Sequence, residues 1–244
     1  MAKNDRPPLT AYRAAFALAL AAVGGFVDVF GYLSLNHVFT ATMSGNTVLI
    51  AVHAEAGDRS AALLHAYAVA MFVAGLLVSG VAIELGLRYR FRRILAVALA
   101  VEAGCLAALA WQGPDQRSLL SLVALAAFSM GLQNISLRTA GVLSVFTTHV
   151  TGTLTRLGEQ FVACAFAIAA RLGRRRAKDD GPAPLAALGQ AGFAASLWLA
   201  FLAGGGTAGA VLPNWGFASL GLPIAVLLVI AGFQLIAPVV PAPG

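Results

Sequence analysis

The sequence predicts an all-α polytopic membrane protein, and two observations carry this prediction. Apolar residues make up 59% of the chain and charged residues only 11%, and the mean hydropathy is +0.84. A water-soluble domain needs more polar surface than this to cover itself. The charged residues also gather in short clusters between long uncharged runs. This pattern is typical of membrane segments joined by loops.

Six runs are long and apolar enough to cross a bilayer, which takes about 20 residues for roughly 30 Å of hydrocarbon. They cover residues 12–35, 62–87, 94–112, 118–138, 189–211 and 217–238. The first run follows a basic leader and contains Ala-x-Ala spacings, as a signal peptide does. It is too long for a typical signal core and carries Asp28 near its far end, so we expect it to be retained as the first span.

Two further apolar segments are ambiguous. Residues 43–56 would reach only about 21 Å as a helix, which is too short to span. Residues 150–172 are long enough, but they contain Arg156 and Glu159, about one helical turn apart and able to pair.

The distribution of basic residues decides between the topologies. With six spans and a cytoplasmic N-terminus, thirteen of the sixteen Lys and Arg lie inside and two outside, with Arg156 left uncounted. If both ambiguous segments spanned, the division would be ten against five. The positive-inside rule therefore predicts six spanning helices plus two short broken or re-entrant segments, with both termini cytoplasmic.

Two pairs of matching stretches and a polar group at a matching position predict an internal duplication. "FTATMSGNT" at 39–47 aligns with "FTTHVTGTL" at 146–154, and "FVAGLLVSG" at 72–80 aligns with "FLAGGGTAG" at 201–209. About seventeen residues before Gly45 and Gly152, a short polar group lies inside a span: Asp28 in the first half, and Asn134 beside Gln133 in the second.

The duplication divides one transmembrane domain, residues 1–238, into a first repeat at about 11–112 and a second at about 118–238. A short tail, 239–244, follows. Each repeat holds three spans, so the repeats are expected to face opposite ways across the membrane. This inverted arrangement is that of many secondary transporters, whose sites lie near the midplane where helices are interrupted.

The two broken segments are the predicted site. Gly45 and Gly152 are expected to let the chain turn, while hydroxyl and amide side chains satisfy freed backbone groups or bind a substrate or ion. The candidate binding residues are Asp28, Ser44, Gly45, Asn46, Thr47, Gln133, Asn134, Thr147, Thr151, Gly152, Thr153 and Arg156. The alternative is that these small and hydroxyl residues only help the helices to pack.

Titratable residues inside apolar runs are functional candidates, because a charge within a span is costly. Asp28 is the candidate for proton or cation coupling, the alternative being a carboxylate near the outer interface. Glu102 and His149 are candidates for a proton relay, although Glu102 could equally be a protonated packing residue. His53 and His65 flank a polar loop and are expected to be hydrated.

Glu84 is expected to pair with Arg88 at the membrane interface. Cys105 and Cys164 lie far apart inside apolar runs, which favours two buried thiols over a disulfide or a metal site.

Several sequence motifs of enzymes are missing. The chain has no G-x4-G-K-[ST], G-x-S-x-G or H-E-x-x-H motif and no Cys/His metal set. We therefore expect no enzyme activity, no catalytic residue, no cofactor and no metal. The net charge of +6 reflects membrane orientation rather than nucleic-acid binding. The expected partners are the lipid bilayer and an unidentified small solute, and a homo-oligomer remains open.

The stretches "GFVDVFGYLSL", "FTATMSGNTV", "GLQNISLRTAG" and "TTHVTGTLTRLGE" resemble the YoaK family of bacterial inner-membrane proteins, a domain-of-unknown-function family. The resemblance runs from about Ala11 to Pro238. It implies a multi-pass protein of the cytoplasmic membrane and supplies no substrate.

The leading interpretation is a small secondary transporter or permease. The alternative is a non-transporting assembly or sensory partner, or a lipid-modifying enzyme with Glu159 and His149 as its acid/base pair.

Overall fold

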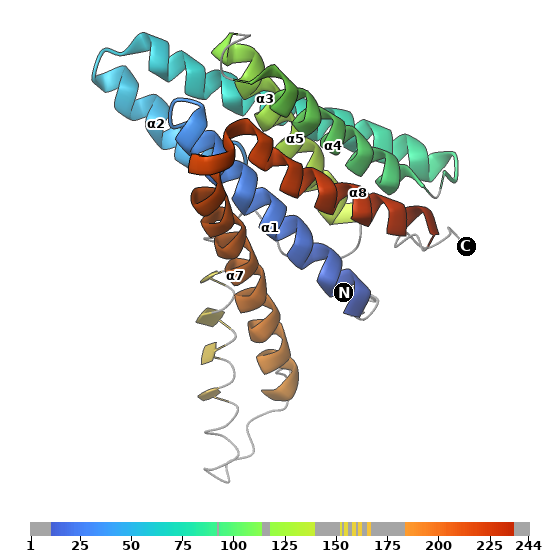
Figure 1. The fold of residues 1–244 in the computed structure, drawn as a ribbon. Helices are drawn as coiled ribbons and strands as arrows, with labels where there is room; N and C mark the ends of the chain where they lie inside the picture. The colour runs from blue at the N-terminus through green and yellow to red at the C-terminus, as the bar shows by residue number, and fades with distance from the viewer. Residues whose placement is uncertain are drawn as a thin grey trace.

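The computed structural model describes residues 11–91, 93–113, 118–139 and 184–236, together with isolated helical positions between 152 and 166. Within these residues all regular secondary structure is helical (Figure 1). The predicted all-α class is therefore confirmed.

Each of the six predicted runs coincides with a helix. The helices are α1 (Ala11–Ser34), α3 (Arg59–Arg88), α4 (Ile94–Gln112), α5 (Leu119–Thr139), α7 (Pro184–Trp215) and α8 (Gly221–Ile236). A 3-10 helix, η1 (Gly216–Leu220), joins α7 to α8. Gly216 turns the chain there with φ of 50°, in the left-handed region that glycine adopts without a steric penalty.

Four stretches of the described chain are long and apolar enough to cross a membrane. They are Ala11–Ser34, Arg59–Gly86, Ile94–Gln112 and Ala191–Ile236, the last of which contains most of α7 and all of α8. The apolar part of α5, Leu119–Asn134, is shorter. These helices support a membrane protein by length and composition.

The first ambiguous segment forms the short helix α2 (Met43–Glu55), whose 13 residues extend over about 20 Å. This confirms that the segment is too short to span. The second ambiguous segment, 150–172, lies mostly outside the described residues.

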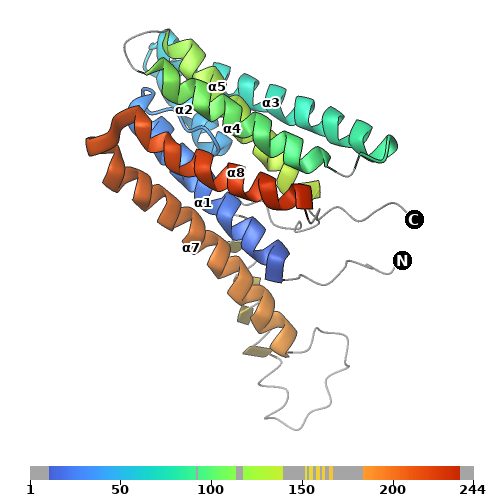
Figure 2. The ribbon, with the colours of Figure 1, turned by 45° about the vertical axis from the view of Figure 1, so that its right-hand side comes forward.

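Helices from the two halves of the chain pack against each other. α1 packs mainly against α7, α3 packs mainly against α5, and α4 lies against both α5 and α8. α2 lies along the beginning of α3 (Figure 1). In both views the start of α1 and the end of α8 lie at the same end of the bundle (Figure 2).

Glycines allow two of these packing contacts to be very close. A Cβ added at Gly25 of α1 would overlap the carbonyl oxygen of Phe201, and one at Gly204 of α7 would overlap that of Ala22. No side chain fits between the two helices at this crossing.

The α3–α5 crossing has the same construction. A Cβ added at Gly75 of α3 would overlap the carbonyl oxygen of Phe128, and one at Gly131 of α5 would overlap that of Phe72. At the exposed end of α3, the predicted ion pair between Glu84 and Arg88 is confirmed at 2.9 Å.

Candidate functional site

The chain reverses direction immediately after α1. Asn36 and His37 have φ of 52° and 61°, both in the left-handed region, which asparagine tolerates better than histidine does. This turn folds the segment 38–42 back along α1. The absence of a side chain at Gly31 makes room there, since an added Cβ would lie 2.9 Å from the Val38 carbonyl oxygen.

Asp28 holds the returning segment in place. Its Oδ1 accepts hydrogen bonds from the backbone N–H of Thr40 (2.8 Å), Ala41 (2.8 Å) and Thr42 (3.2 Å). Its Oδ2 accepts a hydrogen bond from the Thr42 hydroxyl. The side chain is only 4% exposed. Four donors around one buried carboxylate anchor the start of α2 to the last turns of α1.

The predicted position of the break was wrong. Ser44, Gly45, Asn46 and Thr47 lie in the first turn of α2, and the non-helical stretch precedes them. Gly45 does not turn the chain but admits the Phe39 ring, since an added Cβ would lie 2.7 Å from Phe39 Cδ2.

Asn46 is the one fully buried residue of this first turn. Its Nδ2 donates to the Phe39 carbonyl oxygen (2.6 Å), and its Oδ1 accepts from the Phe39 N–H (3.1 Å). These two bonds identify which end of the amide is the oxygen. Asn46 therefore satisfies both backbone groups of a residue that precedes the helix.

The expectation that His65 is hydrated was wrong. Its side chain is 1% exposed, and its Nδ1 lies 3.1 Å from Asn46 Oδ1. Because that oxygen can only accept, Nδ1 carries the hydrogen. The His65 ring also stacks on that of His53, with centroids 5.3 Å apart. The signal for burial was the position of His65 on the inward face of α3. The polar loop nearby in the sequence suggested hydration instead.

We expect Asn46→Leu to destabilise the fold by about 1–3 kcal/mol, because it leaves buried polar groups of Phe39 and His65 unsatisfied. Thr47→Val is the matched control, since Thr47 is exposed and bonds only within its own helix, to the Met43 carbonyl oxygen. Thermal unfolding of the purified proteins measures both. Equal melting temperatures for the two variants would contradict the role given to Asn46.

A second group of polar residues lies inside the bundle. Glu102 of α4 and Gln133 of α5 are fully buried. Within the described ranges, neither carboxylate oxygen of Glu102 and neither amide atom of Gln133 has a hydrogen-bond partner. Asn134, the neighbour of Gln133, is also buried. Glu102 and Gln133 are therefore buried polar side chains whose hydrogen-bonding capacity is unused within the described residues.

Most predicted site residues of the second repeat cannot be placed. Thr147, His149, Thr151, Thr153 and Arg156 lie outside the described residues. Gly152 and Glu159 are helical and exposed.

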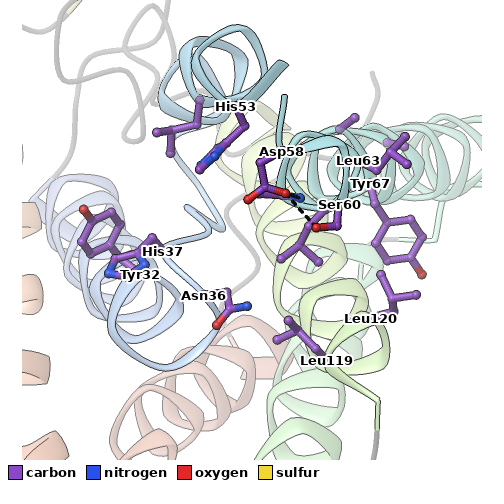
Figure 3. A pocket seen from close by; sticks show the side chains of 15 residues that line it. Tyr32, Asn36, His37, His53, Asp58, Ser60, Leu63, Tyr67, Leu119 and Leu120 are labelled. Carbon is purple, nitrogen blue, oxygen red and sulfur yellow. Dashed lines mark hydrogen bonds between the residues drawn. The ribbon is translucent and has the colours of Figure 1, made fainter. Parts of the chain in front are cut away.

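A groove of about 1030 Å³ opens at the end of the bundle where α1 ends (Figure 3). It is lined by Tyr32, Asn36, His37, Leu49, His53, Asp58, Ser60, Ala61, Leu63, Leu64, Ala66, Tyr67, Ala70, Leu119 and Leu120. None of the predicted binding residues lines it. Sequence reasoning missed this groove because the packing of α2 on α3 and of α3 on α5 brings its lining residues together, and no sequence motif links them.

Asp58 marks the start of α3 at the rim of the groove. Its Oδ1 accepts hydrogen bonds from the Ala61 N–H (3.0 Å) and the Ser60 hydroxyl (2.7 Å), as in a helix N-cap. Both hydrogen bonds lower the pKa of Asp58 from its ordinary value, and the bond from Ala61 contributes most.

Comparison with known proteins gives two matches and one negative result. A family model described as "Protein of unknown function (DUF1275)" matches residues 16–233. The chain is also 32% identical over 152 residues to the UPF0700 transmembrane protein YoaK of Bacillus subtilis (strain 168), covering 61% of this chain and 67% of YoaK. No solved structure matches.

The family match covers most of the chain and confirms the resemblance carried by the four motifs. It includes most of α1, all of α2 and the Asp28 anchor, as well as the buried Glu102 and Gln133. The chain is therefore a membrane protein that belongs to the DUF1275 family and is similar to YoaK.

Proposed function

We propose that this protein is a small secondary permease of the bacterial inner membrane, built from two inverted repeats of three spanning helices each. Both termini face the cytoplasm in this proposal. The observation that carries it is the equivalence of the two glycine crossings.

Two sequence matches together pair residues of the two crossings, with one extra residue in the second repeat between Asn134 and Phe146. The F-x-A-G match pairs Phe72 and Gly75 with Phe201 and Gly204. The match of Asp28 with Asn134, extended three residues upstream, pairs Gly25 with Gly131. The paired residues make the paired contacts: a Cβ added at Gly25 would overlap the Phe201 carbonyl oxygen, and one at Gly131 would overlap that of Phe72.

Each crossing also joins one repeat to the other. α1 of the first repeat meets α7 of the second, and α5 of the second meets α3 of the first. If a duplicated unit is related to its copy by a two-fold axis, the same helix–helix contact forms twice in this way. An arbitrary bundle of six helices has no reason to do so.

The helix directions support an inversion of the repeats. In both views α1 and α5 run in opposite directions along the bundle (Figures 1 and 2). Such pairs of opposed repeats commonly enclose a solute site near the midplane. The end of the bundle holding the groove would then face outward.

The geometry favours Glu102 over Asp28 as the residue that carries a coupling proton. The Asp28 carboxylate already holds four donors and anchors α2. Glu102 is buried in the middle of a long apolar helix without a partner among the residues described. An ionised carboxylate is costly in such surroundings, so uptake and release of a proton there would accompany a change of conformation.

Proton movement in vesicles tests this function. Full-length protein is reconstituted with a pH-sensitive dye inside, and small metabolites are added outside. We expect at least one solute to move protons in the wild type, and Glu102→Gln to reduce this movement to the rate of protein-free vesicles. Glu84→Gln removes an exposed carboxylate and should have no effect. Undiminished movement in Glu102→Gln would contradict the coupling role, and no response to any solute would favour a non-transporting partner protein.

A further inference from the structure

The groove at the end of the bundle has a charge and a shape that suit one class of ligand. We propose that it binds a small organic cation, a protonated amine attached to a short apolar or aromatic body. Binding of the cation does not depend on the proposed function. Only the further step of calling the cation a transported substrate rests on the proposed permease.

The charge on the groove wall is negative. Asp58 is the only lining residue with a side chain that is charged in its ordinary form at neutral pH, and none of the lining residues is Lys or Arg. Arg59, the next residue along the chain, is exposed and does not line the groove. Glu55, four residues before Arg59, is also exposed and outside the lining. Among the described residues, a cation in the groove therefore meets a carboxylate and no lining Lys or Arg side chain.

The Asp58 carboxylate retains capacity for a ligand. The helix-capping bonds to Ser60 and Ala61 both go to Oδ1, whereas a carboxylate has two oxygens and about four acceptor positions. The same two bonds hold the pKa of Asp58 below its ordinary value, so the carboxylate is ionised throughout the neutral range. An ammonium group could bind there without breaking the cap.

The rest of the lining fits the body of such a molecule. Tyr32 and Tyr67 lie on opposite sides of the groove, with Leu119 and Leu120 below them in the view (Figure 3). Aromatic rings attract a cation through their faces, and leucine side chains favour an apolar body.

Parts of this wall are already held in position. Tyr32 packs edge-on against His37, with ring centroids 4.9 Å apart, and His53 stacks on the buried His65. Ordered side chains lower the entropy cost of binding a ligand. The volume of about 1030 Å³ is at the upper end of what small-molecule sites occupy, so affinity is expected to be modest.

Three probes of nearly the same shape test the proposal by thermal shift on the purified full-length protein. They are 2-phenylethylamine, which is cationic, 2-phenylethanol, which is neutral, and 3-phenylpropionate, which is anionic. We expect the amine to raise the melting temperature most, the alcohol less, and the acid not at all. A response to the acid equal to that of the amine, or no response to the amine at millimolar concentration, would overturn the proposal.

Three variants locate the response. Asp58→Asn retains a helix-capping side chain but loses the charge, and it should remove the advantage of the amine over the alcohol. Glu55→Gln removes a nearby carboxylate outside the lining and should leave that advantage intact. Ala66→Phe narrows the groove and should weaken the response to both probes. An amine advantage that survives Asp58→Asn would overturn the assignment of the charge.

The binding and transport claims fail separately. Amine binding that depends on Asp58, without flux of any solute, supports the groove as a cation site and contradicts the permease. Solute flux that depends on Glu102, without amine binding, contradicts only the cation site.

Discussion

Replacing Gly25, Gly75, Gly131 or Gly204 with alanine will destabilise the fold by about 1–3 kcal/mol or more each, because the added methyl group must push two helices apart. At all four positions the new Cβ would overlap a backbone carbonyl oxygen of the opposite helix, which cannot move aside as a flexible side chain would. Thermal unfolding of the purified variants in detergent measures this loss.

The same helices supply the controls. At Gly80 of α3 and Gly209 of α7, nothing lies within 4 Å of an added Cβ. Alanine at these positions should be neutral or stabilise slightly, because alanine favours a helix by about 0.8–1 kcal/mol over glycine. If the variants at the two crossings have the same melting temperatures as the controls, the close contacts between α1 and α7 and between α3 and α5 are wrong.

Removing the Asp28 carboxylate will have the second large effect. In Asp28→Ala the N–H groups of Thr40, Ala41 and Thr42 lose their shared acceptor, and the Thr42 hydroxyl loses its own. Leaving several buried donors unsatisfied should cost about 3 kcal/mol or more, since each such group costs about 1–3 kcal/mol. Hydrogen exchange of the 38–43 segment should increase together with this loss of stability.

Asp28→Asn separates the anchor from the charge. The amide oxygen can still accept the three backbone bonds, so this variant should lose less stability than Asp28→Ala. An Asp28→Ala protein with wild-type stability and wild-type exchange in this segment would contradict the anchoring role. The carboxylate would then again be a candidate for ion coupling.

The sequence alone predicted the elements that depend on apolar runs. The six long helices follow from uncharged stretches of sufficient length, and the shortness of α2 follows from the polar residues on both sides of it. The ion pair of Glu84 with Arg88 was predictable because it joins neighbours on one helix.

The position of the break in the first repeat was not predictable from residue types. Ser44 and Gly45 are common in interrupted helices, yet they continue α2, while Asn36 and His37 make the turn. The difference arises from tertiary contacts: Asp28 collects the amides before the helix, and Gly45 is required by the approach of the Phe39 ring.

The groove illustrates the same limit. No sequence motif links Asp58 with Tyr32 and Tyr67, and the sequence alone predicts a role for none of them. Only the packing of α2 on α3, and of α3 on α5, brings their side chains around one space. Likewise, the burial of His65 depends on Asn46, nineteen residues earlier in the chain.

The orientation of the two repeats is the central claim, and cysteine labelling tests it most directly. Single cysteines are placed at Ser60, which is exposed at the start of α3, and at Ala177, before α7, in a chain whose Cys105 and Cys164 have been replaced. A membrane-impermeant maleimide added to intact cells and to inverted vesicles reports the side of each. We expect Ser60→Cys to react from outside and Ala177→Cys from inside. Labelling of both cysteines from the same side would contradict the inverted repeats and the permease built on them.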